Sequence, residues 1–207
     1  MLTWTIFIAP IAASCSVAGV PAPSLHSPTP TTNPIRNDSA PIRQTDDLGT
    51  RLPFTTTFPD RWSTKNDGTT YEPCTALTDA ELSSVGIDPA TAQDVALANY
   101  QTARGCVWLY HGQTMGRVSH FTGDKPTFNE QRKNRESYIL SYDTMIEGRQ
   151  ALVDARHSMC TITVESEDAP VSTLVTRTWR PPPIAELCAQ AIAFTKLTIP
   201  KMPPPAP

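Results

Sequence analysis

The stretch CTITVESEDAPVSTLVTRTW, residues 160–179, predicts two neighbouring strands joined by a tight turn. β-Branched residues recur through residues 160–166 and again through residues 171–179, which favours strands over helices. Residues 167–170 between them, Glu-Asp-Ala-Pro, have the composition of a turn. Two such strands so close in the sequence pair as a hairpin, so the fold is expected to contain an antiparallel sheet.

More strand-like stretches precede this hairpin and follow one another in a run. They occupy residues 106–110, 115–122, 138–146 and 150–157. Glu147-Gly148 has the composition of the turn between the last two. Asp88-Pro89 is expected to break the chain, and residues 90–104 could be helix or loop. A run of strands, rather than strands alternating with helices, favours an α+β fold.

Three stretches predict helices. Residues 79–85 follow a capping box, in which Thr78 precedes Glu81 by three positions. Residues 128–136 are polar and helix-favouring, and residues 184–196 place their apolar side chains on one face at helical spacing. The sequence therefore predicts an α+β domain with an antiparallel β-sheet of about five or six strands and helices packed on one face.

Five cysteines divide into one near the N-terminus and an even set in the domain. An even set suits an oxidising compartment and predicts two intradomain disulfides, although five reduced thiols remain the alternative. The sequence alone allows three pairings of the four domain cysteines. These four are Cys74, Cys106, Cys160 and Cys188.

An apolar run at residues 2–13, LTWTIFIAPIAA, has the length of a signal peptide and is too short to span a bilayer. Small residues lead from it to Cys15, and this ending resembles a bacterial lipobox. We expect residues 1–14 to be a signal peptide and Cys15 to carry the lipid that anchors the protein to the extracytoplasmic face of the cell membrane. No Lys or Arg precedes the run, so an upstream start codon or a plain secretory signal stays open.

Proline-rich segments are expected to flank the domain. Residues 15–52 combine six prolines with Ser, Thr, Asn and Ala and few large apolar residues, which predicts a disordered, lipid-anchored tether. Residues 200–207, PKMPPPAP, are expected to form a disordered tail. The folded domain is therefore placed at residues 53–199.

Composition and motifs offer no catalytic, metal or cofactor site. A net charge of −3 gives no electrostatic footprint for nucleic acid. Neither a GxSxG elbow nor a glycine-rich phosphate loop occurs. Cys106 lies close to Trp108 and could be a nucleophile, but the even cysteine count favours a disulfide. The histidines show no metal-ligand spacing; they are His26, His111, His120 and His157.

Two groups of charged residues leave a functional alternative open. Asp143 and Glu147 could project together as an acid–base pair, although solvated carboxylates are the more ordinary explanation. Arg132, Lys133 and Arg135 form a basic cluster, which is either a solvated helix face or a contact for an anionic surface. Three aromatic side chains are expected in the core, and an exposed one would mark a binding surface; they are Trp62, Trp108 and Trp179.

Four features of the sequence carry a family resemblance. They are Glu-Pro-Cys at residues 72–74, Gly-Cys-Val-Trp at residues 105–108, Cys160 on a late strand and Cys188 in an Ala-rich helix. Together with the lipobox and the proline-rich arm, they resemble the actinobacterial lipoproteins of the domain of unknown function 3558 family. The resemblance implies that Cys74 pairs with Cys106 and that Cys160 pairs with Cys188. It implies no activity and no functional residues beyond these cysteines.

The first functional hypothesis is a non-enzymatic, lipid-anchored binding module whose partner is an unidentified envelope protein or ligand. A tether, a small disulfide-bonded domain and the lack of a catalytic motif favour it. The second hypothesis is a carrier that holds a hydrophobic ligand between sheet and helix. A third, an envelope hydrolase, requires polar groups with perturbed pKa values in a cleft.

Overall fold

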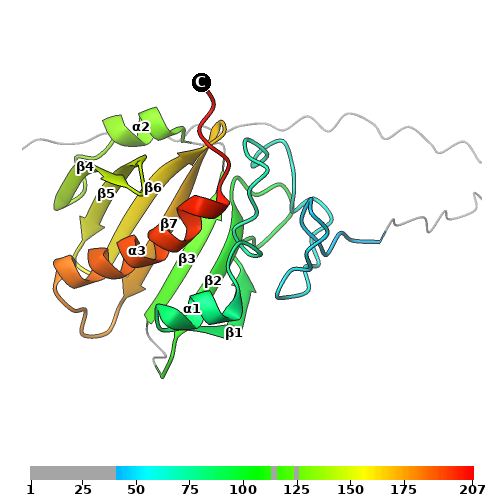
Figure 1. Cartoon of the computed structure of the whole chain (residues 1–207), viewed down its shortest axis with the longest axis horizontal. Helices are drawn as coiled ribbons and strands as arrows, with labels where there is room; N and C mark the ends of the chain where they lie inside the picture. The colour runs from blue at the N-terminus through cyan, green and yellow to red at the C-terminus, as the bar shows by residue number, and fades with distance from the viewer. Residues whose placement is uncertain (1–40, 113–115, 124–125) are drawn as a thin grey trace, which may run out of the picture. The chain divides into compact units, whose positions relative to one another are not determined.

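The computed structural model describes residues 41–207 except 113–115 and 124–125. The expected signal peptide, Cys15 and the tether up to residue 40 lie outside the described residues. Residues 41–207 belong to one compact unit, whose ribbon is shown in Figure 1.

A seven-stranded antiparallel sheet forms the centre of the domain, with the strand order β1-β2-β3-β7-β6-β5-β4. The hairpin β2–β3 and the meander β4–β5–β6–β7 meet where β3 pairs with β7, from Gly116 opposite Arg177 to Thr122 opposite Val171. The strands are β1 (Ile87–Asp94), β2 (Arg104–Tyr110), β3 (Gly116–Thr122), β4 (Leu140–Ile146), β5 (Arg149–Arg156), β6 (Met159–Ser166) and β7 (Ala169–Arg177).

The prediction of five or six strands is wrong, because β1 is an additional strand. It contains Pro89, at which the sequence predicts a break in the chain. Proline lacks a backbone donor, but an edge strand has one side without a partner. The register of β1 against β2 shifts between Asp88 and Gln93, which accommodates the interruption. Within that shift the Leu109 N–H donates to the Thr91 hydroxyl at 2.8 Å.

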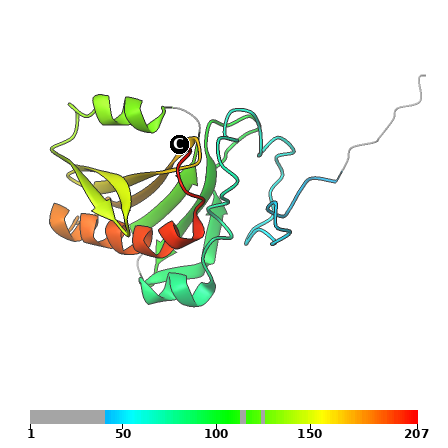
Figure 2. The same ribbon diagram turned by 45° about the horizontal axis from the view of Figure 1, so that its top comes forward.

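The helices lie on both faces of the sheet, so the prediction that they pack on one face is also wrong. Cys160 and Ile162 of β6 point towards α3 (Ile184–Thr198), to which Cys160 is disulfide-bonded. Thr163 points the other way, because side chains alternate along a strand, and its hydroxyl donates to Gln131 of α2 (Phe128–Lys133) at 3.1 Å. Figure 2 shows the sheet between these two helices. The short helix α1 (Asp79–Ser84) begins at the predicted capping box and contacts β1.

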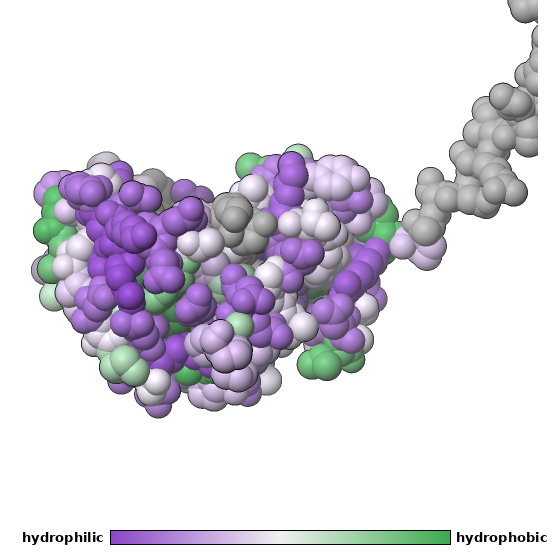
Figure 3. All heavy atoms as spheres, turned by 90° about the horizontal axis from the view of Figure 1, so that it is seen from above, coloured by the Kyte–Doolittle hydropathy of each residue, from purple (hydrophilic) through white to green (hydrophobic). Residues whose placement is uncertain are grey.

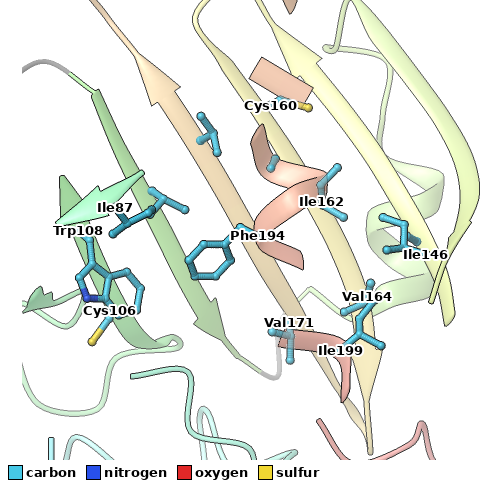
Figure 4. Close-up of a cluster of buried hydrophobic side chains, with 14 of the residues drawn as sticks. Ile87, Cys106, Trp108, Ile146, Cys160, Ile162, Val164, Val171, Phe194 and Ile199 are labelled. Carbon is cyan, nitrogen blue, oxygen red and sulfur yellow. The ribbon is translucent and has the colours of Figure 1, made fainter. Parts of the chain in front are cut away.

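The layer between the sheet and α3 is densely filled. Phe194 projects from the middle of α3 between Trp108 on one side and Ile162 on the other, as Figure 4 shows. These side chains are at most 2% exposed. Burial of this apolar layer is the main favourable contribution to folding.

Both flanks of the expected domain extend further than the sequence suggested. The Gln44 side chain exchanges hydrogen bonds with the backbone of Thr56 at 2.9 and 3.0 Å, so the folded part begins before residue 53. The expected disordered tail, residues 200–207, instead packs on the domain. The Ala206 N–H donates to the carbonyl of Glu167 at 3.1 Å, and Arg149 donates to the carbonyls of Met202 and Pro203. Prolines lack donors but keep their carbonyl acceptors.

We predict that the double substitution C160A/C188A lowers the free energy of unfolding by about 3.5 kcal/mol, because it opens a loop that constrains the unfolded chain. The bond links β6 to α3 across 28 positions. Denaturant unfolding of the variant and of the oxidised wild type measures the difference. An unchanged midpoint would contradict a stabilising role for this disulfide.

Candidate functional site

A groove of about 370 Å³ lies on the sheet face opposite α3. Strand alternation presents Phe121, Thr161 and Leu174 on this face, while their neighbours fill the core. Helix α2 has six residues and covers one part of the face, so the rest stays open. The lining residues are Thr102, Ala103, Phe121, Gly123, Pro126, Gln131, Asn134, Tyr138, Asp154, Met159, Thr161, Pro170, Ser172 and Leu174.

Three polar side chains that line the groove are hydrogen-bonded to neighbouring groups, namely Gln131, Asp154 and Ser172. The hydroxyls of Thr163 and Ser172 lie 3.1 Å apart, and the Gln131 amide donates to the carbonyl of Pro126 at 3.0 Å. Asp154 accepts hydrogen bonds from Arg135 at 2.6 Å and from Ser141 at 2.7 Å. These polar side chains are held in place by their hydrogen bonds, and the rest of the groove wall is largely apolar. Such an arrangement suits ligand binding better than proton transfer.

Asp143, from one of the charged groups identified in the sequence, forms an ion-pair cluster with Arg132 and Arg135 of the other. Asp143 lies 2.5 Å from Arg135 and 3.1 Å from Arg132, and Arg135 also contacts Asp154. Arg132 and Arg135 are therefore partly occupied by carboxylates rather than forming a free cationic patch. Glu147 lies in the β4–β5 turn with a φ of 47°. The structure thus pairs Asp143 with arginines.

His120 is buried at the centre of the domain. Its ring nitrogens lie 2.9 Å from the Tyr71 hydroxyl and 3.0 Å from the Thr173 hydroxyl. Its ring is also close to that of Phe194, at 5.1 Å between centroids. Desolvation lowers the pKa of His120 to about 3, so the ring is neutral at ordinary pH. The residues around His120 in the sequence give no signal that would have predicted its burial.

Glu72 accepts hydrogen bonds from three buried or half-buried side chains. Arg61 donates to both carboxylate oxygens at 3.0 and 3.2 Å, Arg104 donates at 2.9 Å and the Trp62 ring N–H donates at 3.2 Å. The Arg61 side chain is 0% exposed, and its Nε donates to Asp94 at 2.9 Å. This cluster joins the irregular segment before α1 to β1 and β2.

The four domain cysteines form the pairs that the family resemblance implied. Cys74 is bonded to Cys106 and Cys160 to Cys188, each with Cα atoms 5.1 Å apart. The first bond ties the segment before α1 to β2, directly beside Glu72. The cysteines are therefore structural, and the nucleophile alternative for Cys106 is excluded while this bond is formed. Cys15 lies outside the described residues.

A family model described as "Protein of unknown function (DUF3558)" matches residues 10–201. The chain belongs to this family. No curated protein and no solved structure matches it in the same comparisons. Four residues that carried the resemblance to DUF3558 lie close together: Cys74 is bonded to Cys106, the Cys74 N–H donates to Glu72, and Trp108 belongs to the same buried core.

The three domain tryptophans differ in exposure. Trp108 is 2% exposed, as expected for the core, whereas Trp179 is 67% exposed, so the expectation for Trp179 is wrong. Trp62 is half-buried between the guanidinium groups of Arg43 and Arg61, at 4.2 and 4.6 Å from its ring. The exposed Trp179 follows β7 and lies outside the groove.

Within the described residues, no group of three or more His, Cys, Asp or Glu side chains could hold a metal ion. None of the helices in that part of the chain is both long and apolar enough to cross a bilayer. Seen from above, the surface is mostly hydrophilic and shows hydrophobic residues in separate patches (Figure 3).

We predict that His120 makes the domain less stable in acid. The unfolded chain binds a proton on this ring below a pH of about 6.5, whereas the folded protein stays neutral down to about 3, so the free energy of unfolding falls as the pH falls through this window. Between about pH 7 and about pH 5 the loss attributable to His120 is about 2 kcal/mol. Denaturant unfolding of wild type and H120Q at both pH values measures it. Equal losses in the two proteins would contradict the prediction.

Proposed function

We propose that this protein is an exported, lipid-anchored binding module of the cell envelope, and that the groove opposite α3 holds its ligand. Two disulfides inside one small domain support an oxidising compartment. The small-small-Cys ending at Cys15 supports a lipid anchor, and the proline-rich segment that follows supports a tether between anchor and domain.

The groove is the observation that carries the binding role. A volume of about 370 Å³ lies within the range for sites that take small organic ligands. Phe121, Met159 and Leu174 supply apolar contacts, and Tyr138 also lines the groove. Because Gln131, Asp154 and Ser172 are already hydrogen-bonded to neighbouring groups, the favoured ligand is an amphipathic molecule that stacks on the apolar walls and leaves its polar end in solvent.

A carrier that holds its ligand between the sheet and α3 is the second candidate. The side chains that fill that layer would have to give way, and Ile162, Leu187 and Phe194 are at most 1% exposed. Opening this layer would remove close packing between the sheet and α3, which stabilises the native state. The groove on the opposite face is therefore the better place for a hydrophobic ligand as well. Hydrolysis is not proposed, because Asp154 is held by Arg135 and Ser141.

We predict that filling the groove abolishes binding of an amphipathic aromatic dye such as anilinonaphthalene sulfonate. In T161W the indole occupies the groove, since Thr161 lines it from β6. K196W is the matched control, because Lys196 is exposed on α3, on the other side of the sheet, and does not line the groove. Dye titration with melting temperatures measures the effect. Unchanged dye affinity in a folded T161W would refute the groove as the site.

We predict that Cys15 anchors the protein in membranes of the producing cell. Intact mass of the protein from the membrane fraction should match residues 15–207 plus acyl chains, and should rise by four hydrogens on reduction. C15A should leave the membrane fraction, because the acylated sulfur is gone. An unacylated chain beginning at Met1 in the wild type would refute both export and anchoring.

A further inference from the structure

Strand β4 (Leu140–Ile146) ends the sheet with one side open. The opposite edge, β1, carries Pro89 and a register shift, two devices that discourage pairing with another chain. In contrast, β4 pairs with β5 in unbroken register from Leu140 opposite Ala155 to Ile146 opposite Arg149. Its sequence, LSYDTMI, contains no proline, glycine or lysine. It is therefore an extended edge that a further strand can join.

The turn that follows β4 determines which backbone groups point outward. Glu147 and Gly148 have φ of 47° and 76°, as in a two-residue type I′ hairpin turn. In such a hairpin the flanking residues form a hydrogen-bonded pair, and bonding then alternates along the strand. Tyr142 therefore bonds to β5, and the N–H and C=O groups of Ser141 and Asp143 point away from the sheet.

Exposed hydrophobic side chains gather at this edge. Half of the large exposed hydrophobic residues in the described part of the chain lie on β4 or directly before it. Their exposed fractions are 51% for Ile139, 39% for Leu140, 40% for Tyr142 and 63% for Met145. An apolar concentration on an open strand edge marks an interaction surface.

We propose that two copies of this chain associate through β4, antiparallel and related by a two-fold axis, so that the two sheets become continuous. The occupant is a second copy because β4 is complementary to itself. With the axis at Tyr142, Ser141 faces Asp143 of the second copy, and Met145 faces Ile139 of the second copy. Each outward N–H and C=O of Ser141 and Asp143 then gains a partner.

The other symmetric registers that pair outward groups are worse. An axis at Asp143 places two carboxylates directly opposite each other, which is unfavourable. An axis at Ser141 places Asp143 opposite the apolar Ile139 and leaves Met145 beyond the end of the partner strand. An axis at Thr144 places Asp143 opposite the apolar Met145 and Ser141 opposite Glu147 in the turn. The Asp143 charge itself does not block the edge, because Arg132 and Arg135 lie 3.1 and 2.5 Å from its oxygens. Residues of β4 do not line the groove, so the pairing leaves it open.

The axis at Tyr142 is tested by cysteine crosslinking of the full chain in membranes. In a pair of directly opposite, non-hydrogen-bonded residues the Cα atoms are about 4.5 Å apart, within the span of a disulfide. Y142C should therefore form a covalent dimer on mild oxidation. L140C is the matched control. Leu140 lies on the same face of β4 as Tyr142 and is almost equally exposed, but it would lie opposite Thr144 of the second copy. The wild type treated in parallel measures any crosslinking through Cys15.

Light scattering of the purified full chain gives the second readout. The protein mass should be twice that of one chain, and Y142K should halve it without lowering the melting temperature, because two positive charges would lie opposite each other on the axis, whereas the Tyr142 side chain is 40% exposed in one chain. A monomer at every concentration, a different protein bound at β4, or equal crosslinking of Y142C and L140C would overturn the proposal. Dye binding in the groove is unaffected by either outcome, so this test and that of the groove are independent.

Discussion

The buried carboxylate of Glu72 is the interaction on which the rest of the domain depends. It forms ion pairs with Arg61 and Arg104, which are 0% and 3% exposed, and Asp94 supplies the second negative charge of the cluster. Removing one partner of such a cluster would leave a buried charge unpaired, at a cost of roughly 3–5 kcal/mol. Within the described residues before α1, 41–78, there is no helix or extended strand, so this cluster and the neighbouring Cys74–Cys106 bond hold the segment on β1 and β2.

The two faces of the sheet have different roles because helices of different length cover them. The fifteen residues of α3 fill one face with closely packed side chains and a disulfide. The six residues of α2 cover part of the other face and leave the groove beside them. A rigid, cross-linked layer behind the sheet keeps the floor of the groove in place, which reduces the ordering cost of binding a ligand.

Local patterns in the sequence predicted the elements whose determinants are local. The capping box at Thr78 and Glu81, the turn at Glu147-Gly148 and the β-branched run through residues 160–166 each lie within a few residues of the structure they specify. Pro89 misled the prediction, because its effect depends on whether a strand is central or at an edge. The groove could not be predicted, since its residues come from β3, β5, β6, β7 and α2 and their flanking loops.

By itself, the sequence determined the fold class, most strands and helices, and the presence of an even set of cysteines, because periodicity and capping act between near neighbours. Only the tertiary structure decided which face α2 covers, which carboxylates pair with Arg61, why His120 is neutral and how residues 200–207 are held. Each of these depends on groups far apart in the chain, such as Arg149 and the carbonyl of Pro203. Their free energies come from burial and from hydrogen bonds that exist once the chain has folded.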